Sequence, residues 1–207
     1  MCFEDLDKLI RELKEKHTEI CDRWSKHTEP PFNLDKTYPA DIIEENSNKE
    51  FLEYIFQYRE FLAANMTDYS ISLLSRNLEY RIKTKNSIEE KLAKYKEKKS
   101  IETNSKGKFP LKKCLNDLYG ARYFFEGKGL PLEEIEKHLK STFPDFKIKD
   151  ASNGEYKAVH VYFQKDNFSF PWELQVWNQK DAALNKKSHK EHKQDYTKWE
   201  KESLEEK

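Results

Sequence analysis

Five short segments of alternating polar and apolar residues constrain the fold of this chain more than any other feature. They cover residues 78–83, 118–126, 146–149, 156–164 and 171–177. Alternation with a period of two is typical of β-strands that bury one face. Helical patterns separate the first segment from the second and the second from the third. We therefore predict an α+β fold in which a mixed β-sheet is flanked by helices.

The first 77 residues carry helical patterns instead. The predicted elements are a helix over residues 3–27 that Pro30-Pro31 ends, an irregular stretch over 32–47 with a turn of helix near Asp41, and one or two helices over 49–76. We expect the helical region 1–77 to pack on a core formed by residues 78–207. The chain then forms one compact domain that ends in a polar helix over 179–204.

Composition limits the classes of partner. Charged residues make up 37% of the 207 residues, but 38 cations balance 38 anions, so no global field attracts nucleic acid and any basic patch must be local. The three cysteines match no zinc spacing and suit a reducing compartment, which predicts a cytoplasmic protein. No apolar run approaches the roughly 20 residues of a membrane span, so no membrane contact is expected.

Cations gather at the first predicted strand and the helix that follows it. Alternation places Arg81 and Lys83 on one strand face, and Ser87 with Glu90 fits a capping box that begins the helix. Lys91 then lies one turn inside that helix. Several converging cationic donors are what a triphosphate requires. In a chain with 38 Lys and Arg residues, the alternative is an ordinary solvated charged edge.

Two carboxylates accompany predicted strands. Asp117 begins the second strand, and alternation places Glu173 on the same face of the last strand as Gln175 and Trp177. A carboxylate in an apolar strand is costly unless it has a partner, and Mg²⁺ prefers carboxylate oxygens with water and phosphate. The pair therefore predicts a magnesium site. The alternatives are a turn residue after Asn116 for Asp117 and a solvent-side position for Glu173.

Tyr156 and His160 lie four residues apart in a predicted strand, so their side chains share one face. A tyrosine ring can stack on a base, and an imidazole can contact the neighbouring ribose or phosphate. Ordinary packing on the sheet is the alternative for both residues.

Taken in order, these stretches resemble the RelA/SpoT synthetase family, the alarmone synthetases. The matching elements are Arg81, Lys83, Ser87 and Lys91; the segment Asp117-Leu118-Tyr119-Gly120-Ala121-Arg122; Tyr156 with His160; Glu173-Leu174-Gln175; and His189-Lys190. The match spans roughly residues 78–193. It implies a nucleotidyltransferase-like α+β core. No His-Asp pair like that of the family's hydrolase domain precedes residue 78, so we expect a synthetase alone.

The resemblance implies an ATP-dependent pyrophosphokinase with Mg²⁺ as cofactor, which transfers the β,γ-pyrophosphate of ATP to a ribose 3′-hydroxyl. It assigns ATP binding to Arg81, Lys83, Ser87 and Lys91, metal binding and catalysis to Asp117 and Glu173, and acceptor binding to Tyr156, His160, Gln175 and His189. Glu173 can also help to deprotonate the acceptor hydroxyl.

The chain departs from the family pattern at two positions near the acceptor. Glu155 is inserted before Tyr156, and Trp177 stands where the family has an arginine. Trp177 can stack on a base or belong to the core, and the sequence does not choose between these. The chain also ends 15 residues after His192 (207 − 192), before the further helix through which the family's housekeeping members form tetramers.

These departures resemble the toxic members of the family, which act in toxin–antitoxin pairs. They favour the 3′-CCA end of tRNA as acceptor, with lysine-rich segments supplying local phosphate contacts. The alternative is a small alarmone synthetase that makes guanosine tetraphosphate or pentaphosphate from GDP or GTP. A third hypothesis is an inactive nucleotide-binding module. The expected partners are ATP, the tRNA or guanine-nucleotide acceptor and an antitoxin protein, and we expect a monomer without the antitoxin.

Overall fold

The computed structural model describes residues 3–43, 49–66, 77–98, 107–127 and 130–188. Its α-helices are α1 (Glu4–Ser25), α2 (Ala40–Ile43), α3 (Lys49–Met66), α4 (Lys85–Glu97), α5 (Leu111–Cys114) and α6 (Leu132–Thr142). Its strands are β1 (Leu78–Ile82), β2 (Tyr119–Phe125), β3 (Lys147–Asp150), β4 (Val159–Phe163) and β5 (Trp172–Asn178), followed by the 3₁₀ turn η1 (Gln179–Asp181). All five predicted strands are present.

The strands form one sheet in the order β1-β2-β5-β4-β3. The neighbouring strands β2 and β5 run parallel, whereas the other three pairings are antiparallel. Parallel neighbours need a long crossover connection, and here the crossover carries α6, β3 and β4. The predicted α+β class with a mixed sheet and flanking helices is confirmed.

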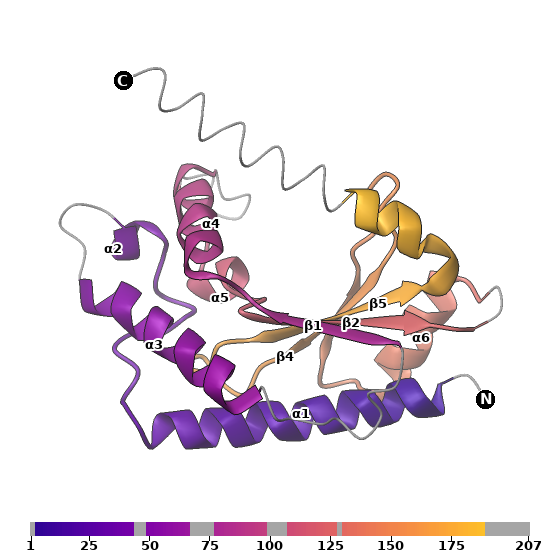
Figure 1. Cartoon of the computed structure of the whole chain (residues 1–207), viewed down its shortest axis with the longest axis horizontal. Helices are drawn as coiled ribbons and strands as arrows, with labels where there is room; N and C mark the ends of the chain where they lie inside the picture. Colours follow the sequence, from indigo (N-terminus) through magenta and orange to yellow (C-terminus); the bar gives the residue numbers. More distant parts are fainter. Residues whose placement is uncertain (1–2, 44–48, 67–76, 99–106, 128–129, 189–207) are drawn as a thin grey trace.

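One face of the sheet belongs to the hydrophobic core. Its apolar side chains, among them Leu174 in β5 and Val161 in β4, join buried residues of α1, α3 and α6 in one cluster. Figure 1 shows α1 running along one side of the sheet, while α4 and the segment after η1 stand on the other side, at its two ends. Polar side chains can therefore lie on the opposite face of the sheet, which does not pack against the core.

Three local predictions at element ends were wrong. Ser87 is not the N-cap of α4: Thr84 caps the helix, and its hydroxyl accepts a hydrogen bond from the Ser87 N–H at 3.3 Å. Pro131 precedes α6 as its N-cap instead of occupying the first helical position. The strand predicted over 156–164 begins only at Val159.

The terminal helical regions agree with their patterns where they are described. α1 matches the helix predicted over residues 3–27, and α3 matches the first part of the 49–76 prediction. Residues 182–188 are helical, and the remainder of the helix predicted over 179–204 lies outside the described residues. The division into 1–77 and 78–207 stays a prediction. Among the described helices, none combines the length and apolarity that crossing a bilayer demands.

The stability of the core should depend on pH through His17 in α1. This fully buried side chain donates from Nε2 to the Phe170 carbonyl at 3.0 Å, and burial lowers its pKa from 6.5 to about 4. A histidine with a depressed pKa stabilises the fold above its unfolded pKa and loses that contribution as pH falls from 6.5 towards 4. The free energy of unfolding, measured with urea, should therefore be about 2 kcal/mol lower at about pH 5 than at about pH 7.5. His17→Gln should remove this difference. An equal loss in the variant would contradict this role.

Candidate active site

Two rows of polar side chains cross the face of the sheet that points away from the core. The registers place Arg81, Gly120, Glu173, Tyr162 and Lys147 in one row and Glu79, Arg122, Gln175, His160 and Lys149 in the next. Glu173, Gln175, His160 and Tyr162 are all buried, at 7 to 9% exposure. Buried polar groups persist where they satisfy one another, so these rows form one connected network.

The predicted cations converge on the predicted acid Asp117, which lies two residues before the first residue of β2. Lys83 Nζ contacts its Oδ2 at 2.8 Å, Lys91 Nζ contacts its Oδ1 at 2.8 Å, and Arg81 Nη2 lies 3.5 Å from Oδ2. Arg81 comes from β1, Lys83 follows that strand and Lys91 lies in α4, so three segments bring them together. We call these four residues the Asp117 cluster.

Charge and burial oppose each other in the Asp117 cluster. Burial would raise the pKa of Asp117, but the charges of Lys91 and Lys83 hold that pKa well below its usual range. Burial also opposes the charge of Lys91, yet Asp117 raises the pKa of Lys91 to about 12. Lys83 makes an equally short contact, but its pKa is lowered, because burial and the repulsion of Lys91 and Arg81 outweigh Asp117. The carboxylate thus stays ionised among cations.

Ser87 lies one turn before Lys91 in α4 and accepts a hydrogen bond from the Thr84 hydroxyl at 3.0 Å. It does not contact Asp117 in any described interaction. His189, the last predicted acceptor residue, lies outside the described residues.

Glu173 lies between two other predicted site residues. His160 Nδ1 is 3.0 Å from its Oε1, and Gln175 Nε2 donates to its Oε2 at 2.8 Å. Burial and the nearby Asp117 would raise the pKa of Glu173, but the hydrogen bond and charge of His160 leave it below the usual value. Glu173 and Asp117 are therefore two buried carboxylates close enough to repel each other.

Tyr156 joins this network from a loop. It lies before β4, where it pairs with Asn153 across a turn in which Gly154 has φ +58°. Its hydroxyl is 2.8 Å from His160 Nε2 and accepts a hydrogen bond from Trp177 Nε1 at 3.3 Å. The prediction of a shared strand face was wrong, because the loop and not the strand carries Tyr156, yet the two side chains do meet.

Trp177 is fully buried, so the base-stacking alternative is excluded in this conformation and the core alternative holds. It packs with Phe124 and Ala158 in a small second cluster at the end of the polar rows. The Arg122 guanidinium carbon lies 3.8 Å from the centre of its ring.

A hollow of about 130 Å³ opens between these groups. It is lined by Glu79, Tyr80, Arg81, Gly120, Ala121, Arg122, Glu173 and Gln175. Gly120 lies between Arg81 and Glu173 in its row, and the absence of a side chain there leaves the floor open. The hollow therefore lies between the most exposed cation of the Asp117 cluster and Glu173.

The donor set fits Mg²⁺ only with help from a substrate. Among the described residues no three His, Cys, Asp or Glu side chains form a metal cage. Mg²⁺ commonly binds one or two carboxylates and completes its shell with water and substrate phosphates. Asp117 and Glu173, two buried carboxylates that influence each other's charge, are suited to this kind of coordination.

Sequence reasoning missed two residues of the network. The Tyr162 hydroxyl lies 3.2 Å from His160 Nδ1, and strand alternation from His160 could have found it. Arg122 stood in the recognised segment without a role; it donates to Glu79 at 3.2 Å and to Gln175 at 3.5 Å. Only the pairing of β2 with β5 brings Arg122 to Gln175, so no local pattern could have revealed the contact.

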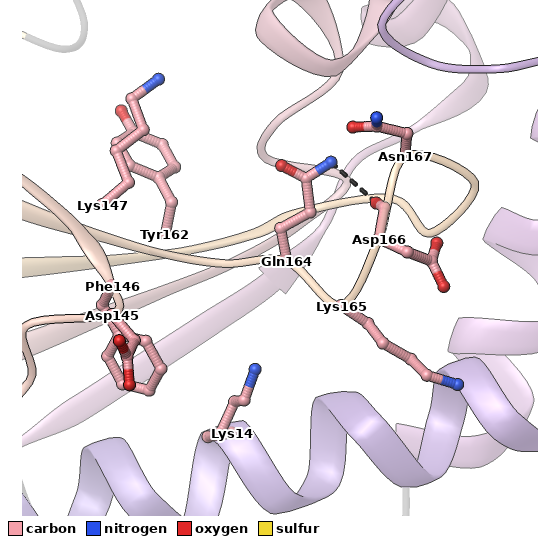
Figure 2. A pocket seen from close by; sticks show the side chains of 9 residues that line it. All are labelled: Lys14, Asp145, Phe146, Lys147, Tyr162, Gln164, Lys165, Asp166 and Asn167. Carbon is pink, nitrogen blue, oxygen red and sulfur yellow. Dashed lines mark hydrogen bonds between the residues drawn. The ribbon is translucent and has the colours of Figure 1, made fainter.

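A larger hollow, of about 490 Å³, lies at the β3–β4 edge. It is lined by Lys14, Asp145, Phe146, Lys147, Tyr162, Gln164, Lys165, Asp166 and Asn167. In Figure 2, Lys147 and Tyr162 lie on one side of this edge and Asp145 and Phe146 on the other. Lys165 contacts Asp22 in α1. Because its charged groups diverge, we do not place the active site there.

Comparison with known proteins gives little guidance. No family model and no curated protein matches the chain. Among solved structures, the crystal structure of small alarmone synthetase 2 from Bacillus subtilis matches with a TM-score of 0.36 and 14% identity, over 70% of this chain and 76% of that one.

Proposed function

We propose that this chain is an ATP-dependent pyrophosphokinase of the RelA/SpoT synthetase type. The observation that carries the proposal is the Asp117 cluster, in which three cations surround one buried carboxylate beside Glu173. A structural ion pair needs one cation. Three cations on one acid leave positive charge for an anionic ligand, as the binding of a triphosphate requires.

ATP binding would exchange partners within the Asp117 cluster. Arg81, with 46% of its side chain exposed, stands at the mouth and meets the phosphates first. Lys83 and Lys91 then turn from Asp117 towards the phosphate oxygens. This exchange frees the Asp117 carboxylate. The ionised carboxylate and the bound phosphates would then be available together as metal ligands.

Mg²⁺, when bound, would neutralise phosphate charge and orient the transferred group. Asp117 and Glu173 are the residues that would hold it. The 3′-hydroxyl attacks the β-phosphorus of ATP and AMP leaves. Glu173 accepts the hydroxyl proton, and Gln175 and His160 fix the two oxygens of Glu173 in place. Tyr156 receives the acceptor's base. Catalysis then rests on positioning and on charge stabilisation.

The favoured acceptor is the 3′-CCA end of tRNA. Its support is local basic charge around the Asp117 cluster: α4 and α5 carry Lys94, Lys96, Lys112 and Lys113 outside the cluster. Phosphate contacts of this kind dominate the affinity of nucleic-acid complexes. GDP or GTP is the second candidate, because the open hollow at Gly120 lies beside Glu173. A ligand as short as one nucleotide would suffice to reach it.

One labelling experiment tests both the activity and the acceptor. The protein is incubated with γ-labelled ATP, Mg²⁺ and one of GDP, GTP or deacylated tRNA, with periodate-oxidised tRNA as a control that lacks the 3′-hydroxyl. Label in intact but not oxidised tRNA supports the favoured acceptor. Label in GDP or GTP alone makes the protein a small alarmone synthetase. Label in none contradicts the proposed function.

Arg81→Ala should weaken ATP binding, whereas Lys85→Ala should leave it nearly unchanged. Arg81 faces Asp117 and the hollow, but Lys85 pairs with exposed Glu60 at 3.3 Å. A hydrogen bond to a charged group contributes about 1.5–3 kcal/mol, so Kd should rise about tenfold to about a hundredfold. Calorimetric titration measures both variants. Equal losses would show that ATP does not bind at the Asp117 cluster.

A further inference from the structure

We propose that Trp177 is a positioning residue for the acceptor: its indole N–H and ring fix Tyr156 and Arg122 at the end of the polar rows. This rests on the proposed function, in which Tyr156 receives the acceptor's base. Trp177 itself is fully buried, so it would act through these two side chains.

Tyr156 needs an anchor because no strand ladder holds it. Its loop is tied by the Asn153–Tyr156 pairing, and β4 begins three residues later. Beyond the backbone, its hydroxyl meets His160 Nε2 at 2.8 Å and Trp177 Nε1 at 3.3 Å. The Trp177 and Tyr156 rings also meet edge to face, with centroids 5.8 Å apart. Trp177 thus contacts both the hydroxyl and the ring of Tyr156.

The indole also begins a chain of hydrogen-bond contacts that runs to Glu173. An indole nitrogen only donates, so the Tyr156 oxygen accepts from Trp177, and the same oxygen lies 2.8 Å from His160 Nε2. His160 extends this chain, because its Nδ1 donates to Glu173 Oε1 at 3.0 Å. The orientation of the base platform is in this way linked to the orientation of the predicted catalytic carboxylate.

Arg122 is the second group that Trp177 holds. The guanidinium carbon lies 3.8 Å from the ring centre, the geometry of a cation–π contact. Its nitrogens donate to Glu79 and Gln175, and the residue lines the hollow. Burial lowers the pKa of Arg122, against the charge of Glu79. The Trp177 ring thus stabilises the half-buried Arg122 guanidinium, which lines the hollow proposed for the acceptor.

The same strand supplies a matched control. Trp172 in β5 is also fully buried, and its Nε1 donates to the Tyr58 hydroxyl at 3.3 Å, on the core face of the sheet. Trp177→Phe and Trp172→Phe therefore delete the same kind of hydrogen bond on opposite faces. Both should lower the melting temperature, but only Trp177→Phe should affect Tyr156.

The first measurement needs no catalysis. With ring-labelled tyrosine, the Tyr156 signal is assigned from Tyr156→Phe and followed by NMR in the full-length protein. Trp177→Phe should shift this signal and leave that of Tyr58, whereas Trp172→Phe should do the reverse. An unmoved Tyr156 signal in Trp177→Phe overturns the proposal. A shifted signal in a protein that labels no acceptor supports the positioning and contradicts only the proposed function.

The second measurement is kinetic and uses both GDP and deacylated tRNA. Trp177→Phe should raise KM for the accepted substrate about fivefold, as expected for one neutral hydrogen bond, and leave KM for ATP within about twofold. Tyr156→Phe, which also removes the contact with His160, should have at least as large an effect, and the double variant should be no worse than Tyr156→Phe alone. If Trp177→Phe does not fold, Tyr156→Phe tests the same bond. Additive effects, or equal rises for Trp172→Phe, overturn the proposal.

Discussion

Asp117→Asn should abolish pyrophosphate transfer and also destabilise the protein. The substitution leaves Lys83 and Lys91 with no carboxylate, although only 10% and 21% of their side chains are exposed. Removing one partner of a buried ion pair costs about 3–5 kcal/mol. Transfer should fall by at least about a hundredfold, the loss typical for a group that stabilises transition-state charge. Denaturant unfolding and the labelling assay measure the two effects.

Asp35→Asn is the control for this stability effect. Asp35 pairs with Lys112 at 2.7 Å, but its side chain is 41% exposed. An exposed pair contributes at most about 1 kcal/mol, so this variant should unfold nearly as the natural protein does. Equal destabilisation by both substitutions would contradict the buried charge balance of the Asp117 cluster.

The same substitution separates phosphate binding from catalysis. In Asp117→Asn the cations no longer have to leave a carboxylate before they meet phosphate. ATP in the presence of a chelator should therefore bind the variant at least as tightly as the natural protein, although transfer is lost. Much weaker binding would show that Asp117, and not the surrounding cations, determines the affinity for ATP.

Strand alternation predicted most of the polar face. It placed Arg81 and Lys83 together, and Glu173 with Gln175, because a period of two is fixed by backbone geometry. The magnesium and ATP roles of these residues stay predictions. What alternation could not give was the strand order, and it is the order β1-β2-β5-β4 that connects these residues across the sheet.

The errors occurred where local chemistry offered two solutions. Thr84 and Ser87 can each cap a helix, and the chain uses the earlier hydroxyl, which begins α4 at Lys85. Trp177 was ambiguous because burial depends on what packs above a strand, and its neighbours Phe124 and Ala158 come from other strands or loops. Such long-range packing leaves no local periodicity.

Glu173→Gln should lower transfer by about 10²- to 10⁴-fold, the range expected for loss of a general base, with a smaller effect on stability than Asp117→Asn. Glutamine keeps the length of the side chain, and its amide oxygen can still accept from His160 or Gln175, which now contact the two oxygens. Neither neighbour is a permanently charged lysine, so no unpaired cation remains buried.

Glu79→Gln provides the comparison for Glu173→Gln on the same face of the sheet. Glu79 also lines the hollow, but its side chain is 49% exposed and pairs with Arg122 and Lys186. Transfer should change less than about fivefold, because an exposed pair contributes little. ATP affinity in the presence of a chelator should be nearly unchanged in both variants, since the cations of the Asp117 cluster are intact. Equal losses of transfer in the two variants would mean that Glu173 acts only through the general negative charge of this face. Near-normal transfer by Glu173→Gln would show that Glu173 has no catalytic role.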